Sequence, residues 1–169
     1  MFDIKPRNYL KYFVIIVLIF FVDRISKIYL LNLYETGTDV NFYILPYLNI
    51  YLIFNTGIGF GLLDFEANTF YHFLTFVIGI IILVLILMLF KQKMINKYFI
   101  SMIIGGSLGN FFDRVYYFAV PDFFDFHIKN FHWFIFNIAD IFITIGLICL
   151  IIAEIFAKDI KKTNNEKNI

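Results

Sequence analysis

Cysteine and charged residues are scarce in this chain of 169 residues, and these two shortages exclude several classes of protein. The single cysteine, Cys149, has no partner for a disulfide and no histidine beside it. A disulfide scaffold and a cysteine nucleophile are therefore excluded, and we expect Cys149 to pack among apolar neighbours. Charged residues make up 16% of the chain, and they form no basic face outside the ends of the apolar segments. Binding to nucleic acid is not expected.

Apolar residues are, by contrast, abundant. They make up 61% of the chain and include 24 phenylalanines and 11 tyrosines, more than a soluble domain of this length can bury. Four stretches are long enough for a helix that crosses a bilayer, which takes roughly 20 residues. They are residues 9–31, 70–90, 98–115 and 134–157. The sequence thus predicts a single integral membrane domain, residues 1–169, of the all-α class with four transmembrane helices.

Lysine and arginine are distributed unevenly among the segments that flank these stretches. The N-terminal segment has Lys5, Arg7 and Lys11, while residues 32–69 have no basic residue. Basic residues return as three lysines in the link at 91–97 and four in the C-terminal tail, with only Lys129 between them in residues 116–133. Because basic residues gather on the cytoplasmic side of a membrane, we expect both termini and the middle link in the cytoplasm. The two longer connections should then lie outside.

Charged residues within the four stretches fall at one depth, near the outer surface. They are Asp23, Arg24 and Lys27 in the first stretch, Asp113 and Arg114 in the third, and Asp140 in the fourth. Asp140 is about 9 Å below the start of its helix at 1.5 Å per residue. An ionisable side chain inside a span costs a few kcal/mol and by default marks a functional site. The alternative is that Arg24 and Lys27 only extend to the outer headgroups.

The two outer connections differ in pattern. Residues 41–46 and 47–54 are rich in aromatic and β-branched residues, which predicts short strands within about 35–62. In the second connection, acidic residues alternate with bulky apolar ones, and we expect an interfacial helix at about 120–130. That helix would place Asp125 one turn from Asp122. His127 and His132 have no third ligand at a matching spacing, so no metal site or other cofactor is predicted.

Five short motifs occur in order along nearly the whole chain. They are DRISK at 23–27, NTGIGF at 55–60, GGSLGNFFDR at 105–114, VPDF at 120–123 and FNIAD at 136–140. Together they resemble the bacterial lipoprotein signal peptidase family, signal peptidase II. The chain departs from the family pattern at Ile58 and Gly59, where the family usually has small residues such as alanine, and at Pro121, directly before Asp122.

The resemblance implies an intramembrane aspartyl endopeptidase of the cell inner membrane. Such an enzyme removes signal peptides from diacylglyceryl-modified prolipoproteins by cutting just before the lipidated cysteine, and inhibitors of the globomycin type act on it. Asp122 and Asp140 would be the catalytic pair. The residues that would line or support the site are Asp23, Lys27, Asn55, Gly57, Asn110, Asp113, Arg114 and Asn137. The family fold also has a small β-cradle outside the membrane, which matches the strands expected at about 35–62.

Hydrolysis by two carboxylates requires them to lie close enough to share one proton. Asp122 and Asp140 can meet if the connection before the fourth helix folds back. We expect Arg114 to pair with Asp113 and to hold the end of the third helix beside them. Two other functions are possible. A small proton- or ion-coupled transporter also uses buried carboxylates, whereas a purely structural membrane subunit would leave them without a purpose.

Overall fold

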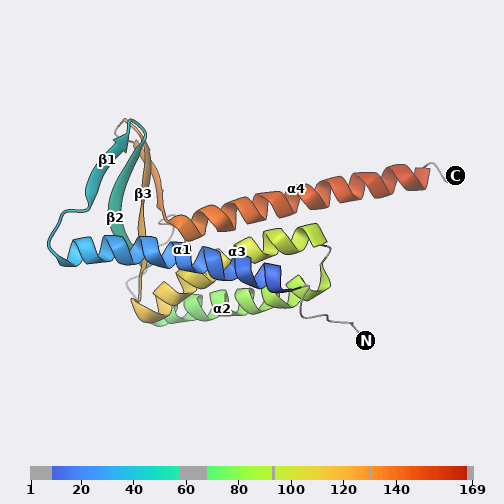
Figure 1. Cartoon of the computed structure of the whole chain (residues 1–169), viewed down its shortest axis with the longest axis horizontal. Helices are drawn as coiled ribbons and strands as arrows, with labels where there is room; N and C mark the ends of the chain where they lie inside the picture. Colours follow the sequence, from blue (N-terminus) through green and yellow to red (C-terminus); the bar gives the residue numbers. More distant parts are fainter. Residues whose placement is uncertain (1–8, 58–67, 93, 130, 167–169) are drawn as a thin grey trace.

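A computed structural model describes residues 9–57, 68–92, 94–129 and 131–166. Within these residues the chain forms four helices and four strands (Figure 1). The helices are α1 (Leu10–Glu35), α2 (Asn68–Lys91), α3 (Met94–Tyr116) and α4 (Ile138–Glu166). The strands are β1 (Asn41–Leu45), β2 (Leu48–Asn55), β3 (Val120–Ile128) and β4 (Phe131–Phe136).

Helix α3 is the centre of the helical part, because it contacts each of the other three helices. Its glycines allow this close packing. A Cβ atom on Gly109 would lie 2.5 Å from Oδ2 of Asp23 in α1, and one on Gly106 would lie 2.5 Å from the carbonyl oxygen of Ala139 in α4. Both distances are too short for any side chain. These glycines therefore set the distances between α3 and its neighbours.

The outer faces of the helices are apolar. On α1, for example, Leu18, Phe21 and Ile25 are 58%, 55% and 65% exposed. Two described segments are long and apolar enough to cross a membrane, Tyr71–Lys91 and Ile138–Ala157. Helices α1 and α3 are of similar length but carry charged residues, and Asp23, Lys27 and Asp113 face inward and are fully buried. These three charges therefore lie inside the bundle, with apolar side chains on its outer faces.

The four strands form one antiparallel sheet in the order β1-β2-β3-β4. In Figure 1 the sheet stands at the end of the molecule where α1 ends and α4 begins, and the start of α1 and the end of α4 lie at the opposite end. The strands expected within 35–62 are confirmed as β1 and β2. Residues 58–62 of that range, with Ile58 and Gly59, lie outside the described residues.

The interfacial helix expected at about 120–130 is wrong, because residues 120–128 are strand β3. The expected start of the last helix at residue 134 is also wrong, since residues 131–136 form β4 and α4 begins at Ile138. The spacing of Asp122 and Asp125 suggested a helical turn. In a strand, successive side chains alternate between faces, so residues three apart point in opposite directions. The two aspartates consequently have different partners.

Candidate active site

Asp140 is positioned by the start of α4. Asn137 precedes the helix, and its Oδ1 accepts a hydrogen bond from the backbone N–H of Asp140 at 3.1 Å. In return, Oδ2 of Asp140 accepts one from the backbone N–H of Asn137 at 3.1 Å. This reciprocal pair is a capping box, which satisfies two otherwise unpaired N–H groups of a helix terminus. The local sequence that starts the helix therefore also fixes the direction of the Asp140 carboxylate.

Asp23 of α1 provides a second carboxylate at the same helix start. Its Oδ1 accepts a hydrogen bond from the backbone N–H of Ala139 at 3.0 Å. Carboxylates are stabilised at helix N-termini by the unpaired N–H groups and by the helix dipole. Helices α1 and α4 are thus joined by a charge-assisted hydrogen bond beside Asp140.

Asp122 enters the site from β3 and is 1% exposed. Asn55, the last residue of β2, donates from Nδ2 to Asp122 Oδ2 at 2.9 Å, and Asn137 donates from Nδ2 to Asp122 Oδ1 at 2.5 Å. Burial, together with the charge of Asp140, raises the pKa of Asp122 to about 7, while the two asparagine bonds oppose that rise. At neutral pH this carboxyl therefore titrates between its neutral and ionised forms.

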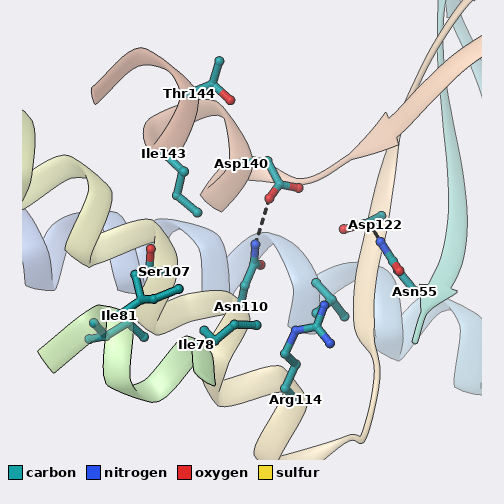
Figure 2. Close-up of a pocket in the computed structure, with 12 residues that line it drawn as sticks. Asn55, Ile78, Ile81, Ser107, Asn110, Arg114, Asp122, Asp140, Ile143 and Thr144 are labelled. Carbon is teal, nitrogen blue, oxygen red and sulfur yellow. Dashed lines mark hydrogen bonds between the residues drawn. The ribbon is translucent and has the colours of Figure 1, made fainter. Parts of the chain in front are cut away.

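Three asparagines hold the two aspartates, and no cation contacts either carboxylate among the described residues. Asn137 binds Asp122 through its side chain and Asp140 through its backbone N–H. Asn110 of α3 donates from Nδ2 to Asp140 Oδ1 at 2.8 Å, the dashed line in Figure 2. Figure 2 shows Asp122 and Asp140 approaching one another from the strand and from the start of the helix. Amide donors hold both groups without neutralising them.

A cluster of charged residues lies directly behind this pair. Lys27 is fully buried, and its Nζ donates to Asp23 Oδ2 at 2.8 Å and to Asp113 Oδ2 at 2.7 Å. Its third hydrogen bond, also 2.8 Å, goes to Asn110 Oδ1. Arg24 is 5% exposed, and its Nη2 lies 2.5 Å from Asp113 Oδ1. The alternative that Arg24 and Lys27 extend to the headgroups is therefore wrong: both point into the bundle.

Arg114 does not pair with Asp113, so that expectation is also wrong. Its Nη2 instead donates to the backbone carbonyl of Gly57. The hydroxyl of Tyr71 in α2 donates to the backbone carbonyl of Arg114 at 3.1 Å, and its ring lies 5.5 Å from the guanidinium. Asn55 reinforces this segment, because its Oδ1 accepts from the Gly57 N–H at 2.9 Å. Arg114 thus links α3 to the end of β2, from which Asn55 reaches Asp122.

A cavity of about 280 Å³ lies in front of the two carboxylates. Its polar end contains Asp122, Asp140, Asn55, Asn110 and Arg114 (Figure 2). The rest of its wall is mainly apolar and is formed by Ile78, Ile81 and Ile82 of α2, Val120 of β3 and Ile143 of α4, with hydroxyl residues Ser107 and Thr144. The cavity therefore suits a ligand that is polar at one end and apolar along most of its length.

All ten residues singled out from the sequence lie in the described part of the chain. Five of them line the cavity, namely Asn55, Asn110, Arg114, Asp122 and Asp140. Asn137, Asp23, Lys27 and Asp113 form the layer behind, and Gly57 enters through its carbonyl. Sequence reasoning missed Tyr71, which no motif marks. It also gave Asp125 the wrong surroundings, since Asp125 is 2% exposed and pairs with His132 at 2.8 Å.

This architecture defines a class: a helical membrane protein with a carboxylate pair at the polar end of an otherwise apolar cavity. Comparisons agree. Residues 15–156 match the family described as Signal peptidase (SPase) II. The lipoprotein signal peptidase of Pelagibacter ubique is 50% identical over 165 residues, 98% of either chain. That of Francisella tularensis subsp. novicida is 41% identical over 92% of this chain and 96% of its own.

Solved structures give the same result. The structure of a bacterial membrane enzyme at 2.3 Å resolution superimposes with a TM-score of 0.71 at 31% identity, covering 88% of this chain and 89% of the other. A second structure of that description, at 1.9 Å, gives a TM-score of 0.65 at 33% identity over 85% and 91%. The chain belongs to the signal peptidase II family. It is therefore a bacterial membrane protein of a protease family, which disfavours a transporter or a structural subunit.

Proposed function

We propose that this protein is an aspartyl endopeptidase that removes signal peptides from diacylglyceryl-modified prolipoproteins, cutting just before the lipidated cysteine. The observation that carries the proposal is the link through Asn137, which hydrogen-bonds to Asp122 and Asp140 at once. The curated relatives are named lipoprotein signal peptidases, and that name supports the substrate class. No cofactor takes part in the proposed reaction.

The surroundings of the two aspartates favour different starting roles. Asp140 accepts hydrogen bonds from a backbone N–H at a helix start and from Asn110, and both favour its ionised form. Asp122 is buried in a strand beside that charge, and its raised pKa of about 7 leaves part of the molecules protonated at neutral pH. Within this proposal Asp140 is the base and Asp122 the acid in the first step, and the two roles exchange in the second.

The reaction then follows from this distribution of protons. Asp140 takes a proton from water as the water oxygen attacks the scissile carbonyl, and Asp122 gives its proton to the carbonyl oxygen. The resulting tetrahedral intermediate returns that proton to Asp122 as its carbon–nitrogen bond breaks. The leaving amine receives the proton held by Asp140. Each aspartate ends in its starting form, ready for another cycle.

The proposed position in the inner membrane uses all four helices as spans, with both termini cytoplasmic and the active site near the outer face. Two observations support it: Asp23, Lys27 and Asp113 of α1 and α3 are turned inward, and the sheet lies at the end opposite the start of α1 and the end of α4 (Figure 1). In a Cys149→Ser background, a membrane-impermeant thiol reagent should label a cysteine placed at Asp39 from outside but not one placed at Gln92. The reverse pattern would refute the orientation.

The apolar wall of the cavity supports a lipid-bearing substrate. Each CH₂ group kept from water contributes about 0.8 kcal/mol, so two acyl chains that remain in the bilayer hold a peptide at the site strongly. We expect the enzyme to require the lipid. We also expect cyclic peptide inhibitors of the globomycin type to compete for the same cavity.

Cleavage of one prolipoprotein by the purified protein in detergent, with and without its diacylglyceryl group, tests the function. We expect the modified form to be cut immediately before its cysteine, as read by mass spectrometry, and the unmodified form to remain intact. Equal cleavage of both would show recognition of the peptide alone. Absence of cleavage of the modified form by folded protein would refute the function.

A further inference from the structure

Two hydroxyl groups line the cavity one helical turn deeper than the aspartates. Ser107 precedes Asn110 by three residues on α3, and Thr144 follows Asp140 by four residues on α4. At 1.5 Å per residue, they lie about 5 and 6 Å deeper along their helices than those two residues. Figure 2 shows both on the side of the cavity away from the strands that carry Asn55 and Asp122.

Neither hydroxyl forms a hydrogen bond with another described residue of the protein. Hydroxyls in helices commonly bond to the carbonyl four residues earlier, and two in this bundle do so: Ser101 Oγ donates to Lys97 at 2.7 Å and Thr75 Oγ1 to Tyr71 at 2.9 Å. Within the residues that the structure describes, Ser107 and Thr144 make no such bond. The donors of Ser107 and Thr144 are thus available to a ligand in an otherwise mainly apolar wall.

A signal peptide that crosses the membrane needs such donors where it is cut. Its spanning part must be helical, because unpaired backbone groups are costly in hydrocarbon. The last four carbonyls of a helix have no partner within that helix. When the helix ends at the scissile bond, these carbonyls extend about one turn below the aspartates. That is the depth of Ser107 and Thr144.

We propose that Ser107 and Thr144 position the substrate by donating hydrogen bonds to backbone carbonyls of its last membrane turn. The inference rests on the proposed function and adds the part of the substrate that this wall recognises. Two hydroxyls on different helices, α3 and α4, would bind the peptide from two sides. These hydrogen bonds would fix the position of the scissile bond relative to Asp122 and Asp140.

The test replaces each hydroxyl by a group of similar shape, with Ser107→Ala, Thr144→Val and the double variant. We expect each single change to lower kcat/KM about three- to tenfold, the range of one net hydrogen bond, and the double variant to lower it further. Mass spectrometry should show the double variant cutting at neighbouring bonds as well. Ser107→Thr and Thr144→Ser, which keep the hydroxyl, should restore rate and cleavage position.

The matched control is Thr75→Val on α2, whose hydroxyl already bonds within its own helix and does not line this cavity. Its rate should equal that of the unmodified enzyme. A substrate with ether-linked alkyl chains distinguishes peptide carbonyls from the ester carbonyls of the lipid. An equal loss on ester and ether substrates supports the proposal, whereas a loss confined to the ester substrate overturns it.

The two proposals fail in different ways. If the unmodified enzyme does not cleave the lipidated prolipoprotein, the function itself is wrong. If it does cleave, and the folded double variant has the same kcat/KM and cleavage position, only the role of Ser107 and Thr144 is wrong. Thermal melting in detergent identifies folded variants, and the single variants decide the question if the double variant has lost its fold.

Discussion

Two pairs of carboxylates lie side by side in this bundle, and their partners are of opposite kinds. Asp23 and Asp113 share the ammonium group of Lys27, and Asp113 also contacts Arg24. Asp122 and Asp140 are held by the amides of Asn55, Asn110 and Asn137. Asn110 belongs to both groups, because it accepts from Lys27 and donates to Asp140.

The difference in partners gives the two pairs different roles, one in stability and one in the proposed chemistry. A buried carboxylate paired with a cation stays ionised, and removing the cation leaves a buried charge that destabilises the fold. A buried carboxylate held by amides keeps its orientation but can still take up and release a proton. Placing the cations one layer behind the aspartates gives a rigid support without neutralising the groups that would act on the substrate.

The largest expected effect is loss of cleavage on replacing either amide-held aspartate. Asp122→Asn and Asp140→Asn should each lower kcat by at least about 100-fold, because acid–base catalysis by a positioned group contributes that much or more. Both proteins should still fold, since the amide has the shape of the carboxylate. Single-turnover cleavage in detergent measures the rate. Near-normal turnover by either variant would remove that residue from the catalytic pair.

The second effect concerns the cation cluster. Lys27→Met should destabilise the protein by about 3–5 kcal/mol, because it leaves Asp23 and Asp113 buried with less compensation. We expect a much lower melting temperature in detergent and poor accumulation in the membrane. A variant with Asp23→Asn added should recover part of this loss. If Lys27→Met melts at the normal temperature, the structural role given to the cluster is wrong.

The third effect is a pH dependence of stability that originates in Asp122. Its pKa is raised to about 7 in the folded protein, above the usual carboxyl value of 3.8. Between these values the folded state holds a proton that the unfolded state has lost, so stability falls as pH rises, at up to about 1.4 kcal/mol per pH unit. The fall ends above pH 7. Melting temperatures from pH 4 to 8 should show a shallower slope for Asp122→Asn.

The smallest effect should come from Asp125, the other acidic residue of β3. Its partner His132 has a side chain that is 56% exposed, and pairs of that kind contribute about 1 kcal/mol or less. Asp125→Asn should therefore keep cleavage within about threefold. It is also the control for Asp122→Asn, since it makes the same chemical change on the same strand. Loss of activity in Asp125→Asn with retention in Asp122→Asn would reverse the two assignments.

The sequence predicted much of this arrangement for physical reasons. Apolar length identified the long helices, and the cost of charge in hydrocarbon identified Asp23, Lys27, Asp113 and Asp140 as one layer. Lys27 does bond to Asp23 and Asp113, and Asp23 bonds to the backbone next to Asp140. The catalytic roles of Asp122 and Asp140 came from the resemblance, and they stay predictions until cleavage is measured.

The errors arose where local pattern did not determine the fold. Residues 120–128 carry aromatic side chains on both faces, so neither helical nor strand periodicity was clear. Pairing with β2 on one side and β4 on the other decides for a strand. Arg114 was paired with Asp113 because they are adjacent in the chain. In the helix, neighbouring side chains point about 100° apart, and Arg114 reaches Gly57 instead.

The position of Asn137 has a consequence for the timing of biosynthesis. This residue and Asp140 lie at the junction of β4 and α4, the last elements of the described chain, and they complete the contacts of Asp122 and Asn110. A ribosome-bound chain that lacks α4 has no second carboxylate and no capping box to aim one. The newly made protein should therefore be unable to cut prolipoproteins in the same membrane until its final helix has been inserted.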